Sequence, residues 1–241
     1  MGDEKELISL LTEGAGEYGL TLEISQVNAF LKYMDMLKDW NKKINLTAIE
    51  EDRDIIIKHF LDSVSIIPYI DNNIKNLIDI GTGAGFPGIP VKICKGEVEV
   101  TLLDSLDKRI KFLNEVINIL ELPGISAVHG RAEDFGRDLQ YREKFDCAVA
   151  RAVANLPVLL EYCLPFVKTG GLFIAMKGSN IEEVDISSKA LNSLGGEIEN
   201  IYTLTLPFSD IKRNIITVRK LRQTPTKYPR KAGKPLKVPL V

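Results

Sequence analysis

After residue 76, short apolar runs alternate with stretches of helical periodicity, and this alternation limits the fold more than any other feature of the sequence. The runs that can form strands are residues 77–80, 98–103, 125–129, 145–150 and 172–176. Helical candidates lie between them, one of which has the apolar stripe Leu106, Ile110, Leu113, Ile117 and Leu120. Such alternation predicts an α/β fold, with a parallel sheet and helices on both of its faces.

Two more strand candidates, residues 195–206 and 214–221, follow one another without a clear helix between them. We therefore expect the sheet to end in an antiparallel pair. Residues 1–70 instead show apolar residues at helical spacing. The pattern predicts a helical extension, 1–70, packed on a core domain, 71–221, which is followed by a basic tail, 222–241.

Three helix starts can be read from local signals. Thr47 and Glu50 match an S/T-x-x-E capping box. Ser105 can cap the helix that carries the stripe described above, and Asn155 with Pro157 can begin another. Trp40 falls on an apolar helical stripe, which favours a place in the core over a base-stacking platform.

Composition excludes several classes of protein. Hydrophobic residues make up 45% and charged residues 27% of the chain, which indicates a globular protein. No apolar run approaches the ~20 residues of a membrane span. The first six residues hold three acids and resemble no signal peptide, so we expect a cytoplasmic protein. Three cysteines without a C-x-x-C pair and two distant histidines predict neither disulfides nor a metal site.

Charge is distributed unevenly along the chain. Residues 211–241 hold ten of the 31 Lys and Arg residues and no acid, whereas the rest of the chain has an excess of acids. Clustered basic residues bind phosphate groups, so one interpretation of this segment is an arm that contacts nucleic acid. The alternative is a solvated terminus without such a role.

The stretch from Asn76 to Gly88 is the most informative for function. An apolar strand runs into alternating glycines, and a helix candidate follows. Glycines allow a sharp turn and a close approach of the backbone to a ligand, and the N–H groups of such a turn can receive an anionic group.

Two ligands compete for this loop. Gly83, Gly85 and Gly88 match the dinucleotide fingerprint G-x-G-x-x-G. Asp79, followed by Gly81, Gly83 and Gly85, matches the pattern of class I S-adenosylmethionine-dependent methyltransferases. An acid at residue 79 would repel a pyrophosphate but could face the ammonium group of S-adenosylmethionine. We therefore favour the methyl donor and retain an NAD(P)-dependent oxidoreductase as the alternative.

Further candidates follow the next two strands. Asp104 ends a predicted strand and could accept both ribose hydroxyls in either nucleotide interpretation. Ala132 and Glu133 follow the third strand, where they could bond the edge of an adenine. Alternatively, Asp104 and Glu133 bind no ligand, and each only complements the positive end of a helix dipole. An RNA-binding module that keeps a cofactor pocket without turnover is a third possible function.

The sequence resembles the bacterial small-subunit ribosomal RNA guanine-N7 methyltransferases, the glucose-inhibited division protein B family, over nearly its whole length. The markers are W-N-K-K-I-N-L-T from Trp40, K-H-F-L-D-S from Lys58, D-I-G-T-G-A-G-F-P-G from Asp79, G-R-A-E from Gly130, A-R-A from Ala150 and Y-P-R-K-A-G from Tyr228. Lys234 departs from the Thr or Ser expected after the last motif.

The resemblance implies that the core domain is a Rossmann-like methyltransferase domain. It also implies methyl transfer from S-adenosylmethionine to N7 of a guanine, position 527 of 16S ribosomal RNA. The substrate could be free RNA or a small-subunit particle, and we expect the enzyme to be a monomer. By motif match, the cofactor pocket includes Gly81, Phe86, Ala132, Glu133 and Arg151, besides Asp79, Gly83 and Asp104.

Guanine N7 carries a free lone pair at neutral pH, so we expect no catalytic acid or base. Arg151 is expected to position cofactor or guanine, with a surface ion pair as its alternative. The residues expected to contact RNA are Lys43, Lys58, His59, Lys177, Arg219, Arg222, Arg230 and Lys231. His59 could equally be a hydrogen-bonded helix residue.

Overall fold

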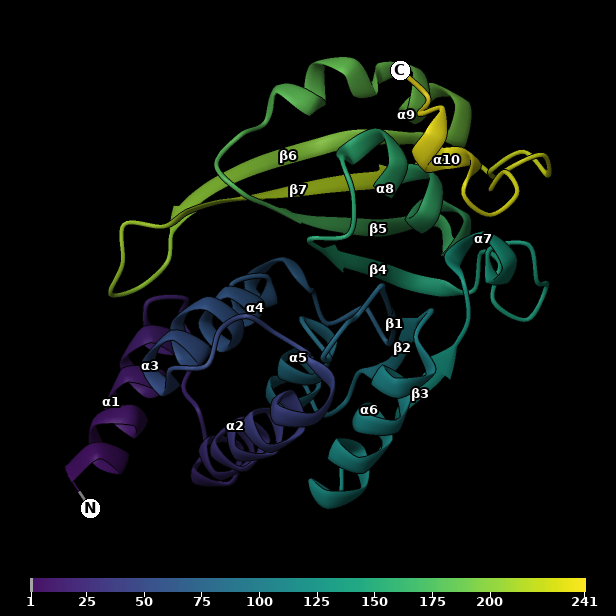
Figure 1. The fold of residues 1–241 in the computed structure, drawn as a ribbon. Coiled ribbons are helices and arrows are strands. Elements are labelled where there is room, and N and C mark those ends of the chain that lie inside the picture. The colour runs from purple at the N-terminus through teal and green to yellow at the C-terminus, as the bar shows by residue number, and fades with distance from the viewer. Residues whose placement is uncertain (1) are drawn as a thin grey trace.

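The computed structural model describes residues 2–241, which form one seven-stranded sheet in the order β3-β2-β1-β4-β5-β7-β6 (Figure 1). The strands are β1 (Asn76–Ile80), β2 (Glu99–Asp104), β3 (Ile125–His129), β4 (Phe145–Arg151), β5 (Val167–Lys177), β6 (Gly196–Thr205) and β7 (Lys212–Lys220). The first five are parallel, and β7 is antiparallel to both β5 and β6. The predicted α/β class and the antiparallel end of the sheet are both confirmed.

The helices are α1 (Gly2–Gly16), α2 (Ile24–Ile44), α3 (Asp52–Ile55), α4 (Asp62–Val64), α5 (Gly88–Cys94), α6 (Asp107–Ile119), α7 (Ala132–Phe135), α8 (Leu156–Cys163), α9 (Ser188–Leu194) and α10 (Lys234–Lys237). A π-helical segment, Ile56–Leu61, joins α3 to α4. Short 3-10 turns cover Ile67–Tyr69, Leu164–Phe166 and Glu182–Ser187.

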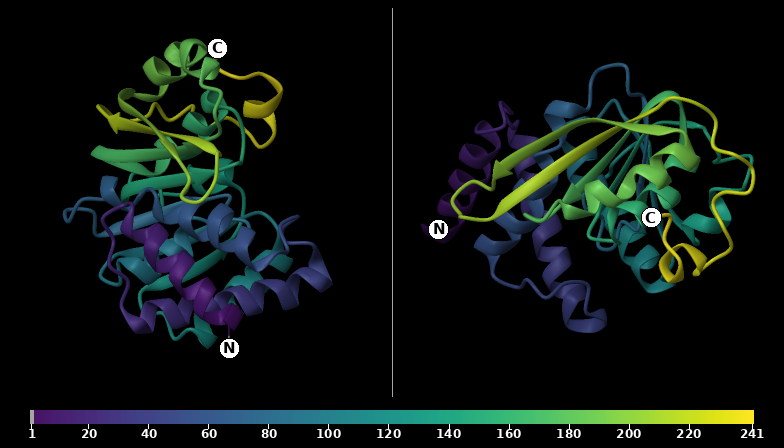
Figure 2. Two further views of the ribbon diagram at one scale, coloured as in Figure 1. Left: turned by 90° about the vertical axis from the view of Figure 1, so that its left-hand side faces the viewer. Right: turned by 90° about the horizontal axis from the view of Figure 1, so that it is seen from above.

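The strands divide the core into two apolar layers because successive side chains of a strand point to opposite faces. In β4, Cys147 and Val149 lie in the layer shared with the N-terminal helices and α5, whereas Ala148 and Ala150 lie in the layer shared with α8 and α9. Figure 2 shows the N-terminal helices, in purple and blue, on the opposite side of the sheet from the green helices α8 and α9. Continuing this alternation, Arg151 belongs to the face that the N-terminal helices cover.

The N-terminal helices are attached to the core by apolar and polar contacts. The stripe of α2 that the sequence predicts is buried at Val27, Phe30, Met34 and Leu37. The hydroxyl of Tyr33, also buried, donates to the carbonyl of Ala84 in the glycine loop. Residues 2–70 therefore form a layer that touches the glycine loop directly.

Two predicted helix starts are wrong, and one is confirmed. The helix after Thr47 begins only at Asp52, because the Thr47 hydroxyl accepts from the N–H of Ile49 within a turn. Ser105 does not cap α6, because Asp104 Oδ1 accepts from the N–H of Leu106 instead. Asn155 caps α8 as expected, accepting from the N–H of Val158 at 3.4 Å.

The last twenty residues lie along the α8 side of the sheet, at the yellow end of the colour scale in Figure 1. Tyr228 and Leu240 are buried in the same apolar layer as α8 and α9.

We predict that Gly88→Ala destabilises the protein. A Cβ at residue 88 would lie 2.3 Å from Leu102 Cδ2 and 2.9 Å from Asp79 Oδ2, and such overpacking costs about 1–3 kcal/mol. Gly96→Ala is the matched control, since nothing lies within 4 Å of its added Cβ, and it should change stability by less than about 0.5 kcal/mol. Urea unfolding of the two variants measures both values. Equal stabilities would contradict the tight packing at residue 88.

Candidate active site

The loop after β1 depends on glycines in the left-handed region. Gly81 and Gly83 have φ of +70° and +63°, which side chains other than glycine rarely adopt. A Cβ on Gly81 would also lie 2.7 Å from Val153, whereas the space beside Gly83 is open apart from one carbonyl oxygen at 4.0 Å. The space beside the Cα of Gly83 is thus open, whereas its N–H already donates to Asp104.

Asp79 does not face that open space. Its side chain is fully buried, and Oδ2 accepts from the Thr82 hydroxyl at 2.6 Å and from the N–H of Gly88 at 2.8 Å. Oδ1 is buried without a hydrogen-bond partner, and burial raises the pKa of this carboxyl to about 6. The expected direct contact with a cofactor ammonium group is therefore replaced by a structural role, in which Asp79 fixes the loop and the start of α5.

The same contact bears on the dinucleotide interpretation. A pyrophosphate in a G-x-G-x-x-G site lies at the N-terminus of the following helix. Here the N–H of Gly88, the first residue of α5, already donates to the buried Asp79 carboxylate. A second anion at that helix end would meet a carboxyl group, so the geometry disfavours a pyrophosphate.

Asp104 stands at the carboxyl end of β2, beside the glycine loop. Its Oδ2 accepts from the N–H of Gly83 at 2.9 Å and lies 3.1 Å from Arg109 NH1. Its side chain is 2% exposed and lines a hollow beside the loop. Asp104 thus supports the turn and also lines the hollow, where the sequence predicts that it accepts the ribose hydroxyls.

Two hollows flank the loop and share Gly81. One, of about 340 Å³, is lined by Gly81, Asp104, Ala132, Glu133 and Leu236 among others. Ala132 begins α7, so no helical carbonyl accepts its N–H. The other, of about 200 Å³, includes Gly83, Phe86 and Arg151. The structure therefore brings together every predicted cofactor residue except the buried Asp79.

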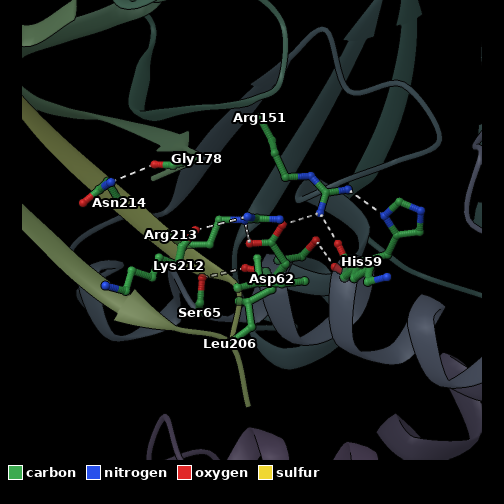
Figure 3. Close-up of polar contacts among 12 residues, drawn as sticks. His59, Asp62, Ser65, Arg151, Gly178, Leu206, Lys212, Arg213 and Asn214 are labelled. Carbon is green, nitrogen blue, oxygen red and sulfur yellow. Dashed lines mark hydrogen bonds and ion pairs between the residues drawn. The ribbon is translucent and has the colours of Figure 1, made fainter. Parts of the chain in front are cut away.

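Arg151 is held by an extensive network, which Figure 3 shows. Its NH1 lies 3.1 Å from Asp62 Oδ2 and 3.2 Å from the carbonyl of Lys58, and its guanidinium lies over the Phe86 ring at 4.9 Å. The other oxygen of Asp62 accepts from Nε of Arg213 at 3.1 Å. The side chain of Arg151 is only 13% exposed, so its ion pair with Asp62 is not the surface ion pair that the sequence left as an alternative.

His59 lies in the same network as a neutral residue. Its Nδ1 is 3.2 Å from Arg151 NH2 and accepts a hydrogen bond from it, so Nε2 carries the proton toward the Thr47 hydroxyl at 2.8 Å. Burial and the charge of Arg151 lower the pKa of His59 to about 3. The ring stacks on Phe86 with centroids 4.5 Å apart. His59 is thus an internal support more than a surface RNA contact.

Three residues of this network were missed by the sequence interpretation: Thr47 as a site residue, Asp62 and Arg213. Asp62 lies within the K-H-F-L-D-S motif, but nothing local shows that its carboxylate is buried. Arg213 occupies β7, 62 residues after Arg151. The side chains of Arg151 and Arg213 point to the face of the sheet that the N-terminal helices cover. Only the order of the strands shows that the carboxylate of Asp62 can pair with both arginines.

Most of the predicted RNA contacts already have partners within the chain. Ion pairs join Lys58 to Asp54, Lys177 to Glu183, Arg219 to Glu199 and Arg230 to Glu161. Arg222 donates to the carbonyl of Asn192. Lys43 and Lys231 are exposed, and no ion pair forms at either among residues 2–241. These two remain the freest candidates.

The cysteines are not placed for chemistry. Burial raises the pKa of Cys94 to about 12 and raises that of Cys147 and Cys163 further, so all three are inert thiols. Over residues 2–241, no cluster of His, Cys, Asp and Glu could hold a metal ion. In the same range, no helix combines the length and apolar character needed to cross a bilayer.

The sheet order, with the predicted cofactor residues at the carboxyl ends of β1, β2 and β4, defines a class I S-adenosylmethionine-dependent methyltransferase. TYW2 of P. horikoshii in complex with MeSAdo shares this fold with a TM-score of 0.52 and 16% identity, over 66% of this chain and 61% of that one. TYW2 of M. jannaschii in complex with AdoMet has a TM-score of 0.52 and 14% identity, over 67% of this chain and 76% of that one.

The family model described as rRNA small subunit methyltransferase G matches residues 26–216, and the chain belongs to this family. Ribosomal RNA small subunit methyltransferase G of Acetivibrio thermocellus is 64% identical over 240 residues, 99% of each chain. The protein of the same name from Alkaliphilus oremlandii is 55% identical over 98% of this chain and 99% of its own. The predicted family, enzyme class and cofactor are confirmed, and nothing in these comparisons supports the oxidoreductase.

We predict that Asp79→Asn changes the pH dependence of stability. The folded state raises the pKa of Asp79 from its ordinary 3.8 to about 6, so folding favours the protonated form. The free energy of unfolding therefore contains a contribution that is present at low pH and is lost as pH rises from about 4 to 6. Asparagine cannot ionise but can still accept from Gly88.

Urea unfolding at pH 4 and at pH 7.5 measures this contribution. From pH 4 to pH 7.5, the free energy of unfolding of Asp79→Asn should rise by about 2 kcal/mol relative to that of the unmodified protein. This is the size expected when folding shifts a pKa by about two units. If the free energies of unfolding of the two proteins differed by the same amount at both pH values, Asp79 would not titrate in this range.

Proposed function

We propose that this enzyme transfers the methyl group of S-adenosylmethionine to N7 of guanine 527 in 16S ribosomal RNA, acting in the cytoplasm as a monomer. Family membership supports the ribosomal RNA substrate, and the relatives bear the name of small-subunit RNA methyltransferases. The observation that carries the proposal is the pair of hollows that meet at Gly81, one for the nucleoside part of the cofactor and one at Arg151.

The residues around Arg151 suit a reaction that needs positioning more than proton transfer. When bound, S-adenosylmethionine supplies a methyl group that is already electrophilic. Guanine N7 needs no deprotonation, and the neutral His59, which donates to Thr47, is not available as a base. Correct alignment of the two reactants can lower the barrier by up to ~7–11 kcal/mol.

Arg151 is well suited to such alignment. Its guanidinium is fixed by hydrogen bonds to Asp62, the Lys58 carbonyl and His59. The ring of Phe86 packs against the face of the guanidinium. A fixed guanidinium can bond the O6 edge of a guanine or a carboxylate of the cofactor without reorganising. Since Arg151 lines the smaller hollow together with Gly83, it stands between the methyl donor and an incoming base.

We further propose that RNA approaches over the edge that holds both hollows. Arg131 lines the larger hollow and Arg109 lines the smaller one, and Lys43 is exposed near the end of α2, four residues before Thr47. Basic side chains at this edge would neutralise phosphates next to a guanine that has left its stack.

We expect Arg151→Ala to lose activity while the protein stays folded. The loss should be about 10²–10³-fold in turnover, as for other fixed donors of an active site. Folding should persist because Asp62 keeps Arg213 as its partner. The assay is transfer of labelled methyl to hypomethylated 16S RNA, with and without small-subunit proteins, followed by mapping of the modified nucleotide.

Arg219→Ala serves as the control. Arg219 lies at the end of β7 opposite to Arg213, pairs with Glu199 and lines neither hollow. Its turnover should stay within about twofold, as for other surface ion pairs. A folded Arg151→Ala enzyme with full turnover would exclude the positioning role. Mapping to another nucleotide would refute the proposed target.

We also predict that the double variant Lys43→Gln, Arg131→Gln weakens RNA binding and its salt dependence. The slope of log affinity against log salt should fall by roughly 0.7 for each RNA phosphate that the protein no longer neutralises. Lys189→Gln, on α9 and lining neither hollow, should leave the slope unchanged. Filter binding of an RNA fragment over a salt series gives these slopes. An unaltered slope in the double variant would place the RNA elsewhere.

A further inference from the structure

The C-terminal segment reaches the cofactor hollow. Gly233 and Leu236, which the sequence places in a basic tail, line the same hollow as Gly81, Asp104 and Ala132. The N–H of Gly233 donates to Glu133 Oε1 at 2.9 Å. One wall of the hollow therefore comes from Gly233 and Leu236, and Gly233 lies 100 positions further along the chain than Glu133, to which it donates.

Strong contacts fix this segment on the side that precedes Gly233. Arg230 donates to both oxygens of Glu161, with Nε 2.9 Å from Oε1 and NH2 2.6 Å from Oε2. Glu161 is fully buried in α8. A buried carboxylate without its partner would cost several kcal/mol, so this pair holds the backbone of the segment in place.

Two more arginines fix the segment through its carbonyl groups. Arg142 donates to the carbonyls of Tyr228 at 2.8 Å and Thr224 at 2.6 Å, and Arg137 donates to that of Pro229 at 2.7 Å. Beyond the hollow, Leu240 is buried in the core. The residues that line the hollow thus lie between two anchored stretches.

The exposure of Leu236 indicates that this wall binds a ligand. Leu236 lines the hollow and is 59% exposed, and Leu106, which precedes α6 and lines the same hollow, is 42% exposed. Exposed apolar side chains that converge on one hollow commonly mark a binding site. The polar groups beside them, Asp104 and the N–H of Ala132, suit a ribose and the edge of a purine.

We propose that the C-terminal segment is a part of the S-adenosylmethionine site, in which Leu236 covers the adenine ring and Gly233 holds Glu133 in place. This assignment gives the segment a cofactor-binding role in place of the RNA-binding arm that its charge suggests. The purine would bury the side chain of Leu236 and exclude water from the adenine pocket.

The test compares Leu236→Asp with Val238→Asp. Val238 is 58% exposed, lies two residues further along the same segment and does not line the hollow, so it is a matched control. Calorimetry with S-adenosylhomocysteine and with methylthioadenosine, which keeps the adenine but lacks the amino-acid part, gives the dissociation constants. Melting temperatures confirm that both variants fold.

Leu236→Asp should weaken both ligands about tenfold, since a charge would replace an apolar contact with the purine. Val238→Asp should bind both ligands like the unmodified protein. Equal effects of the two substitutions, or none, would overturn the proposal. A Leu236→Asp protein with unchanged ligand affinity but weakened binding to an RNA fragment would restore the interpretation of the segment as an RNA arm.

Discussion

The carboxylate of Asp62 joins the N-terminal helices to the edge of the sheet where the site lies. It accepts from Arg151 at the end of β4 and from Arg213 in β7, and it is almost completely buried. A buried acid is tolerable only when cations and hydrogen bonds compensate for its lost hydration. Arg151 also depends on the acid, because burial lowers the pKa of Arg151 and Asp62 counteracts this effect.

This constraint explains why the helical extension belongs to the catalytic unit. The π-helical segment brings His59 and Asp62 toward the sheet, and the loop at Thr47 is fixed in turn by Asn41, whose side chain accepts from the N–H of Thr47 at 2.8 Å. A π-helical turn is rare and costs hydrogen-bond quality, so its presence beside Arg151, the predicted positioning residue, is in keeping with its use at active sites. The extension thereby shapes the place where the acceptor base would enter.

Local patterns predicted the strands, the glycine loop and most residues around it, because strand periodicity and positive φ angles depend on neighbours in sequence. Contacts between distant residues could not be predicted in this way. Asp79 is an example: its spacing to Gly81 is that of a cofactor site, yet its orientation follows from the pleat of β1 and from Gly88 packing beside it. Arg213 likewise became relevant only once β7 was placed antiparallel to β5.

The basic C-terminal segment shows where charge counting fails. Its arginines were counted as unpaired because the acids that match them lie elsewhere in the sequence. One signal was available: Glu161 is the only charged residue in the apolar helix Leu156–Cys163, and an isolated acid in such a helix requires a buried cation. Arg230 supplies it, while Arg137 and Arg142, from outside the segment, bind its backbone carbonyls. Charges used in this way order a chain segment that has few apolar residues of its own, and an ordered segment can form the wall of a pocket. Order at the C-terminus and the shape of the hollow that Gly233 and Leu236 line thus have the same physical cause.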